Sequence, residues 1–125
     1  MRLGNGRRAD VLGVNARGLL WLAEVKVARA DLLADRKWTG YRDHCDGFLW
    51  AVPEALAPLL DAPAFVPAEA GLVVADRHAA VLVRPPVVRP LPPARRRAVT
   101  LALARTSVER LYRLADPGFE AFAAW

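Results

Sequence analysis

The sequence predicts a mixed α/β domain in which helices pack on a small central sheet. Two apolar runs, residues 9–14 and 19–27, flank a short polar segment and predict a pair of strands. Residues 48–52 form an unbroken apolar run, which is typical of a strand buried on both faces. Residues 94–114 contain no Gly or Pro and have the composition of a long helix.

The composition indicates one globular domain. The chain has 125 residues, of which 54% are hydrophobic and 25% are charged. Its net charge of +5 and pI near 10.3 favour a polyanionic partner, nucleic acid before a membrane surface. A generally arginine-rich composition is the alternative explanation. The single Cys45 suits a reducing cytoplasm, and we find neither a signal peptide nor an apolar stretch long enough to span a bilayer.

The first strand pair is expected to close through a three-residue turn that ends at Gly18. Glycine readily takes the left-handed conformation that follows a type I turn in such a hairpin loop. In that register Asn15 faces Leu19, and Asp10 lies opposite Glu24. Side chains opposed in this way point to the same face, with Cβ atoms about 4.5–5.5 Å apart.

These acidic side chains lie among apolar residues. A buried carboxylate is destabilising unless a cation compensates it, and two facing carboxylates repel each other. A divalent ion would resolve both problems, and the oxygens of Asp10 and Glu24 suit Mg²⁺ or Mn²⁺. Lys26 emerges on the same face, where it could orient or deprotonate a water or contact a phosphate oxygen. The alternative is a Glu24–Lys26 salt bridge on a solvated face, with Asp10 unrelated.

Short helices are expected after this strand pair. Residues 30–37 predict one helix with Asp31 at its N-cap, and Thr39 can cap a further turn. Asp31 and Asp35 are expected to be capping and surface charges, and a role as metal ligands is the alternative. Trp38 is expected to pack in the core rather than to stack on a base.

The second half of the chain completes the sheet and adds the long helix. An apolar stripe on that helix is expected to face the core and consists of Leu101, Ala104, Val108, Leu111 and Ala115. The elements are, in order, a loop at 53–67 with one helical turn near 54–60, strands at 71–75 and 80–83, a proline-rich connector at 85–93, the helix at 94–114 and a tail at 115–125.

Several side chains are candidates for contacts to nucleic acid. Lys37 and Tyr41 lie four residues apart, so on one face of a continuous helix both could reach a phosphate. A solvated Lys37 and a core Tyr41 with its hydroxyl at the edge are the alternative. The arginines of the long helix form either a solvated face or a DNA-backbone face. The candidate nucleic-acid-binding residues are Arg8, Lys37, Tyr41, Arg95, Arg96 and Arg97.

The residues around the hairpin resemble the core of the PD-(D/E)XK nuclease superfamily. RAD at 8–10 is similar to its first acidic motif, and WLAEVK at 21–26 to its second acid and lysine. Further short segments resemble the MmcB-like group of bacterial DNA-repair proteins and so narrow the resemblance to that group. These segments are residues 29–31, 35–38, 41–43, 45–46, 51–53, 71–76 and 94–101. The similarity covers roughly residues 6–114, and we assign residues 1–114 to one nuclease-like domain.

This resemblance implies a restriction-endonuclease-like α/β fold and a metal-dependent DNA endonuclease of DNA repair. Asp10 would match the first acid, Glu24 the second and Lys26 the lysine. The backbone carbonyl of Val25 would be a further ligand for Mg²⁺ or Mn²⁺, and the metal would activate a water for phosphodiester hydrolysis. Ala9 stands where the superfamily name has proline.

One departure from the superfamily concerns the N-terminal helix. The superfamily core normally opens with a helix that often supplies another acid, whereas only nine residues of non-helical composition precede Asp10. Either this core helix is lacking or the start of the chain is misassigned, and in both cases we expect a third acidic ligand to be in doubt and one apolar sheet face to be uncovered. A second protomer or another protein could cover that face. A catalytically inactive DNA-binding or interaction module that retains the nuclease fold is the alternative function.

Overall fold

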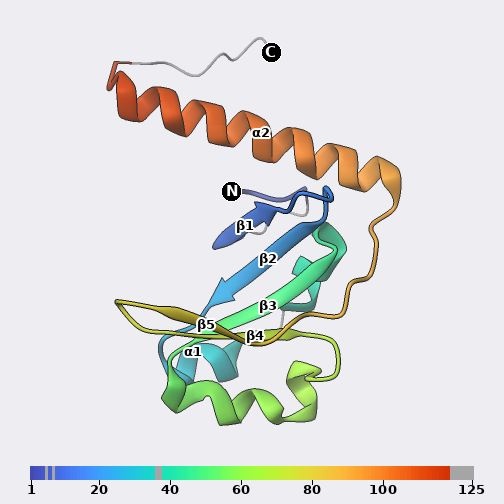
Figure 1. Cartoon of the computed structure of the whole chain (residues 1–125), viewed down its shortest axis with the longest axis vertical. Coiled ribbons are helices and arrows are strands. Elements are labelled where there is room, and N and C mark those ends of the chain that lie inside the picture. The colour runs from blue at the N-terminus through green and yellow to red at the C-terminus, as the bar shows by residue number, and fades with distance from the viewer. Residues whose placement is uncertain (5, 7, 36–37, 119–125) are drawn as a thin grey trace.

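The structure is a computed structural model that describes residues 1–118 except residues 5, 7, 36 and 37. A five-stranded sheet in the order β1-β2-β3-β4-β5 forms its centre (Figure 1). The central strands β2, β3 and β4 are parallel, and the edge strands β1 and β5 are antiparallel to their neighbours. The strands are β1 (Val11–Val14), β2 (Leu20–Val25), β3 (Gly47–Val52), β4 (Gly71–Ala75) and β5 (Ala80–Arg84). The predicted mixed α/β fold is confirmed.

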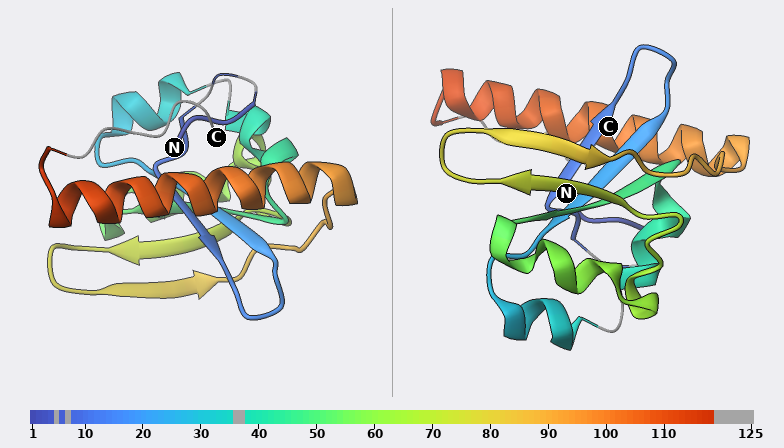
Figure 2. Two further views of the ribbon diagram at one scale, coloured as in Figure 1. Left: turned by 90° about the horizontal axis from the view of Figure 1, so that it is seen from above. Right: turned by 60° about the horizontal axis from the view of Figure 1, so that its bottom comes forward.

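The helical elements flank this sheet on different sides. In Figure 1, α1, η2 and η3 lie below the sheet, η1 lies next to the start of β3, and α2 crosses over the β1–β2 hairpin (Figures 1 and 2). The helices are α1 (Arg29–Ala34), η1 (Trp38–His44), η2 (Glu54–Asp61), η3 (Pro63–Phe65) and α2 (Pro93–Ala115). In the described part of the chain, no helix is both long and apolar enough to cross a membrane.

The β1–β2 hairpin has the predicted turn and register. Gly18 has a φ of 79°, and its N–H donates to the carbonyl of Asn15 at 3.0 Å. The Asn15 side-chain oxygen accepts hydrogen bonds from the N–H groups of Arg17 and Leu19, which fixes the loop. Val11 pairs with Ala23 in the resulting ladder. Local turn chemistry therefore sets which residues of the two strands face each other.

An aromatic cluster fills the core beneath the central strands. Trp50 on β3 is fully buried and meets Trp38, Phe48 and Phe65 with ring centroids 5.1–5.6 Å apart. Edge-to-face contacts of this kind stabilise the core beyond the area that they bury. Trp38 is thus a core residue, as predicted, and β3 is the buried central strand expected from its unbroken apolar sequence.

The first helix differs from its predicted start and capping. Helix α1 begins at Arg29, and Ala28 occupies the N-cap without a side-chain hydrogen bond. Asp31 lies in the first turn instead, where its charge still complements the helix dipole. Thr39 lies inside η1, which begins at Trp38, so it does not cap a later turn. The predicted capping positions, Asp31 and Thr39, were therefore both wrong. Each lies two or three residues after the place where a cap would stand.

The predicted apolar stripe of the long helix faces solvent. Leu101, Val108 and Leu111 are 48–66% exposed, whereas Val99 is buried against Leu20 and Leu91. Only one part of α2 lies over the sheet, and its other end extends beyond it (Figure 1). Among the described residues of α2 the buried one is Val99, so the helix turns a different face inward from the one that its own periodicity predicts.

One face of the sheet is partly open. Alternation along the strands and the pairing register place Val11, Val25 and Leu82 on the face opposite the aromatic cluster. These side chains are 54%, 45% and 49% exposed. In the described residues no helix precedes β1, and the expected apolar, partly uncovered face is present.

Candidate functional site

The hairpin brings Asp10 and Glu24 into one hollow. Glu24 lies near the end of β2, and Asp10 directly precedes the pair formed by Val11 and Ala23. The Asp10 carboxylate accepts a hydrogen bond from the N–H of Val25 at 2.9 Å, which holds Asp10 against the end of β2. The hollow is lined by Asp10, Glu24, Val25, Lys26, Val27, Asp31, Ala34 and Asp35. The two acids thus share one side of the sheet, as the hairpin register predicts.

The carboxylate of Glu24 is buried where its negative charge is poorly compensated. Its side chain is 4% exposed, and in the described part of the chain its Oε1 atom has no hydrogen-bond partner. Burial, followed by the nearby charge of Asp10, raises the pKa of Glu24 from 4.5 to about 7, although Lys26 opposes the shift. A buried carboxylate with an unpartnered oxygen and a like charge beside it is a favourable place for a cation.

Lys26 lies between two acidic groups of the hollow. Its Nζ atom is 3.0 Å from the Asp35 carboxylate and 4.0 Å from that of Glu24. Burial alone would lower the pKa of Lys26, but the hydrogen bond and charge of Asp35, with the charges of Glu24 and Asp10, raise it. Lys26 therefore stays protonated near neutral pH. This favours a role in orienting a water or contacting a phosphate, not one in removing a proton from water.

Asp35 lies at the site through a contact with Lys26 that was not predicted from the sequence. It was expected to be a surface charge, but its side chain is only 11% exposed and pairs with Lys26. Asp35 is the C-cap residue of α1, which is six residues long and follows β2 after a short turn. Helix α1 brings Asp35 back beside the end of β2, and the spacing of residues in the sequence does not predict this contact.

Replacing Asp35 with asparagine should lower the pKa of Lys26, because burial would then act with less opposition. The lysine titration can be followed by NMR of the Lys26 side chain, assigned with Lys26→Arg. Asp31→Asn provides a matched control, since Asp31 lines the same hollow and is exposed. An equal lysine pKa in Asp35→Asn and in the control would show that the Asp35 contact does not set the charge of Lys26.

The acidic hollow fits a small divalent cation. Asp10 and Glu24 offer carboxylate oxygens, which are the ligands that Mg²⁺ and Mn²⁺ prefer. A cation there would satisfy the Oε1 atom of Glu24 and remove the repulsion between the two acids. Among the described residues, no three His, Cys, Asp or Glu side chains already form a metal-binding group. Backbone oxygen, such as that of Val25, and water would therefore have to complete the coordination.

Arg8 and Tyr41 meet away from this hollow. Tyr41 is buried in the core, and its hydroxyl donates to the backbone carbonyl of Arg8 at 3.2 Å. The structure thus shows the alternative interpretation of Tyr41, a core ring with its hydroxyl at the edge. The Arg8 side chain is exposed. Lys37 lies outside the described residues, so its predicted place beside Tyr41 stays a prediction.

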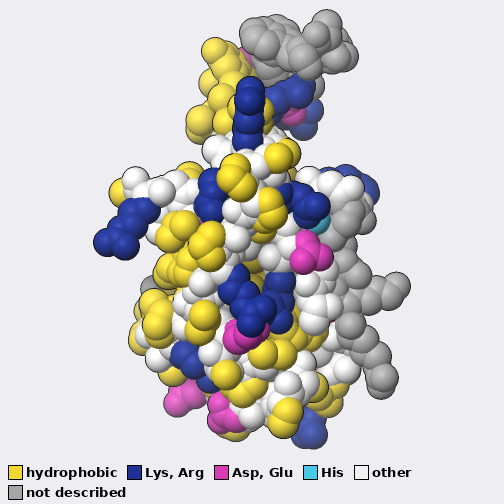
Figure 3. All heavy atoms as spheres, turned by 90° about the vertical axis from the view of Figure 1, so that its right-hand side faces the viewer, with side chains coloured by type: hydrophobic (Ala, Val, Ile, Leu, Met, Phe, Trp, Pro, Cys, Tyr) yellow, Lys and Arg dark blue, Asp and Glu magenta, His cyan; other side chains and the backbone are white. Residues whose placement is uncertain are grey.

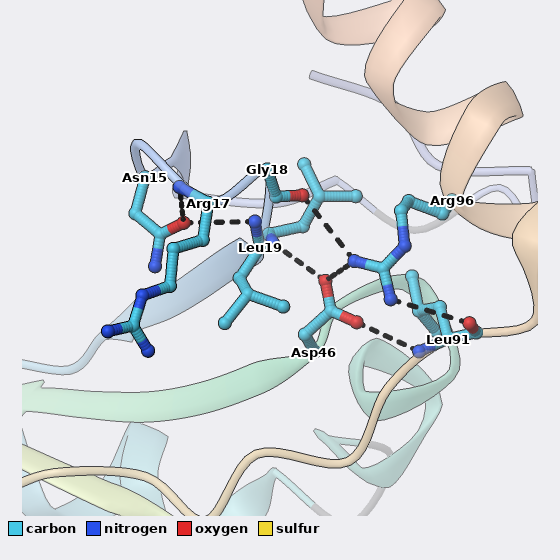
Figure 4. Close-up of polar contacts among 8 residues, drawn as sticks. Asn15, Arg17, Gly18, Leu19, Asp46, Leu91 and Arg96 are labelled. Atoms are coloured by element: carbon cyan, nitrogen blue, oxygen red, sulfur yellow. Dashed lines mark hydrogen bonds and ion pairs between the residues drawn. The ribbon is translucent and has the colours of Figure 1, made fainter.

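The arginines at the start of α2 lie at the other end of β2. Arg96 pairs with the carboxylate of Asp46 and also donates to the carbonyl oxygens of Gly18 and Leu91 (Figure 4). Arg96 is therefore part of a structural network rather than a free contact for DNA. Its neighbours differ, because Arg97 is exposed and Arg95 donates to the carbonyl of Asp43 at 2.9 Å.

Asp46 is the centre of that network and was missed in the sequence. Its carboxylate accepts the N–H of Leu20 at 2.7 Å and the N–H of Leu91 at 2.8 Å, in addition to Arg96 (Figure 4). Burial opposes ionisation, but these hydrogen bonds and the charge of Arg96 outweigh it and hold the pKa of Asp46 below its ordinary value. One side chain thereby ties the start of β2, the connector and α2 together.

The mixed sheet, its flanking helices and the paired acids beside a lysine define an α/β domain consistent with the PD-(D/E)XK class. The chain belongs to the MmcB-like family, described as "DNA repair protein MmcB-like", whose model matches residues 1–118. The family resemblance found in the sequence is thus confirmed, and the family indicates a role in DNA repair.

A solved structure has the same fold. It is the SPO1766 protein of unknown function from Silicibacter pomeroyi, which is 39% identical and superimposes with a TM-score of 0.83. The similarity covers 95% of this chain and 79% of that one. A comparison with curated proteins found no match.

Proposed function

We propose that the chain is a Mg²⁺- or Mn²⁺-dependent DNA endonuclease that acts in DNA repair. The observation that carries the proposal is the buried Glu24 carboxylate, with one unpartnered oxygen, in the same hollow as Asp10 and the cationic Lys26. The family supports the biological context, and the net charge of +5 supports a polyanionic substrate.

In this proposal, Asp10, Glu24 and the carbonyl of Val25 hold the cation. The ion, when bound, supplies Lewis-acid polarisation of the phosphodiester and lowers the pKa of a water ligand. Lys26 orients the attacking water and offsets the negative charge that develops on the phosphate. Asp35 keeps the Lys26 ammonium group within the hollow through its 3.0 Å contact.

The raised pKa of Glu24 makes cation binding depend on pH. With a pKa of about 7, a large share of Glu24 is protonated at neutral pH in the absence of a cation. A cation must displace this proton, so its affinity should rise as the pH increases through 7. The raised pKa of Glu24 and the affinity of the site for a cation are therefore coupled.

The nuclease proposal is tested with a panel of branched, nicked and abasic DNA in Mg²⁺ and in Mn²⁺. Glu24→Gln and Lys26→Ala should each abolish cleavage, because one removes a cation ligand and the other the positive charge. Glu54→Gln is a matched control on the exposed surface of η2 and should cleave as the wild type does. Circular dichroism should show that all variants fold. Cleavage unchanged in Glu24→Gln would refute the assignment of the site.

A catalytically inactive DNA-binding module is the second candidate. It is favoured by the absence of a preformed three-residue acidic group among the described residues. Calorimetric titration with Mg²⁺ and Mn²⁺ in the absence of DNA separates the two candidates. A chain that binds DNA but neither metal could not carry out the proposed hydrolysis.

A further inference from the structure

We infer that a second hollow, lined by arginines, binds a phosphate of the nucleic-acid backbone. This inference rests on the proposed DNA substrate and names a contact surface for it. We call this hollow the arginine hollow. It lies between η1, the segment before β4, the connector and the start of α2, and its charged and polar lining consists of Thr39, Arg42, Asp43, Asp46, Glu69, Arg89 and Arg95. Figure 3 shows basic side chains gathered beside an acidic one in the middle of this face of the molecule.

Glu69 organises two of these arginines. One of its carboxylate oxygens pairs with Arg42 and the other with Arg89. The Glu69 backbone is fixed as well, because its carbonyl accepts the N–H of Val87 at 2.8 Å. One carboxylate neutralises only one of the two guanidinium charges, so this group keeps an excess positive charge while both side chains are held in place.

Arg95 adds a third guanidinium group to the rim. It donates to the backbone carbonyl of Asp43, which is uncharged, so this bond leaves the charge of Arg95 in place. Asp46 contributes little negative charge to the hollow because Arg96 pairs with it. The exposed Asp43 carboxylate is the remaining acid of the lining. With Arg96 counted, the basic groups therefore still outnumber the acidic ones.

The donors that remain suit a phosphate. Arg42 and Arg89 each reach Glu69 through one terminal nitrogen, and a guanidinium group carries five N–H donors. Its planar fork matches phosphate oxygens, which makes arginine a common phosphate ligand. The floor beneath these groups is apolar and includes Phe48 and Leu91. A cationic rim over an apolar floor can accept a sugar–phosphate unit.

The arginine hollow and the acidic hollow lie near opposite ends of β2. The N–H of Leu20, the first residue of β2, donates to Asp46 at the arginine hollow, and Glu24 lies four residues further along the strand. At about 3.3 Å per residue, this distance is roughly 13 Å.

The inference is tested by fluorescence anisotropy with labelled single-stranded and duplex DNA in EDTA, where no metal-dependent cleavage occurs. Arg42→Ala and Arg89→Ala should each weaken binding roughly threefold at moderate salt and reduce the slope of log affinity against log salt by about 0.9. Arg77→Ala, at an exposed position between β4 and β5, is the control and should bind as the wild type does. Equal affinity and equal slope in all three variants would overturn the inference.

Two further measurements keep the result interpretable. Arg89 is 65% exposed, so Arg89→Ala should leave the melting temperature nearly unchanged, and Arg42→Lys retains the charge if Arg42→Ala unfolds. DNA binding that depends on both arginines, in a protein that never cleaves, would sustain the arginine hollow and refute the nuclease. Metal-dependent cleavage together with DNA affinity that survives both substitutions would refute the arginine hollow and support the nuclease.

Discussion

Replacing Asp46 with alanine is expected to lower the free energy of unfolding by about 3–5 kcal/mol. The Asp46 side chain is fully buried and accepts hydrogen bonds from the backbone of Leu20 and Leu91 and from Arg96. Alanine would leave two buried N–H groups without an acceptor and would remove the ion pair of Arg96, and each unsatisfied buried group is destabilising. The loss can be measured by urea denaturation at pH 7.

Asp61→Ala is the matched control for this measurement. Asp61 also pairs with an arginine, Arg84, but at 3.7 Å and with a side chain that is 74% exposed. Its loss should change the free energy of unfolding by less than about 1 kcal/mol. If Asp46→Ala were no more destabilising than Asp61→Ala, the network around Asp46 would not be what joins α2 to the sheet.

The Asp46 network also predicts acid sensitivity. The folded state holds the pKa of Asp46 below its ordinary value of 3.8, so the unfolded chain binds the proton more tightly. The stabilisation is therefore present above about pH 4 and is lost as the pH falls through the lower, folded pKa. Asp46→Ala should show a shallower loss of stability with acid than the wild type does.

Replacing Glu24 with glutamine is expected to raise the free energy of unfolding, whereas Asp46→Ala lowers it. In EDTA at pH 8, Glu24→Gln should be more stable than the wild type, by on the order of 3 kcal/mol. The physical reason is that the ionised Glu24 is buried beside Asp10, which raises its pKa from 4.5 to about 7. Glutamine has nearly the same shape and carries no charge, so it avoids that penalty.

The stability difference between Glu24→Gln and the wild type depends on pH. The folded state binds the Glu24 proton more tightly than the unfolded chain does, so wild-type stability falls as the pH rises from about 4.5 to about 7. The advantage of Glu24→Gln should therefore be largest above pH 7 and vanish near pH 4.5. Thermal melts between pH 4.5 and 8 in EDTA measure it.

Added cation should reverse the order of stability. A cation that binds only the folded state stabilises in proportion to the logarithm of its concentration over its Kd, so Mg²⁺ or Mn²⁺ should stabilise the wild type and not Glu24→Gln. Glu54→Gln, on the exposed surface, should respond to the cation as the wild type does. Equal destabilisation of Glu24→Gln at every pH would mean that Glu24 is a structural hydrogen-bonding residue.

The two substitutions separate stability from function at the two ends of β2. Asp46, which bonds to the start of β2, is buried, ionised and fully hydrogen-bonded, whereas Glu24, near the end of β2, is buried with an unpartnered oxygen. Groups that reduce stability in this way are typical of functional sites. The difference supports placing the proposed chemistry at Glu24 and the structural role at Asp46.

Local sequence determined the hairpin and therefore the candidate site. The Asn15–Gly18 turn fixes the register through its own hydrogen bonds, so the juxtaposition of Asp10 and Glu24 follows from residues adjacent in the chain. The unbroken apolar run likewise identified β3 as the central strand. These features depend on backbone conformation and strand alternation, which short stretches of sequence encode.

Only the tertiary structure decided the contacts between distant segments. It pairs Asp35 with Lys26, joins Asp46 to Leu91 and Arg96, and turns Val99 of α2 inward while Leu111 faces solvent. Each of these depends on how a helix or connector docks on the sheet, and docking follows from the fit of whole surfaces. The periodicity of one helix or the charge of one residue does not contain that information, because the partner surface comes from elsewhere in the chain.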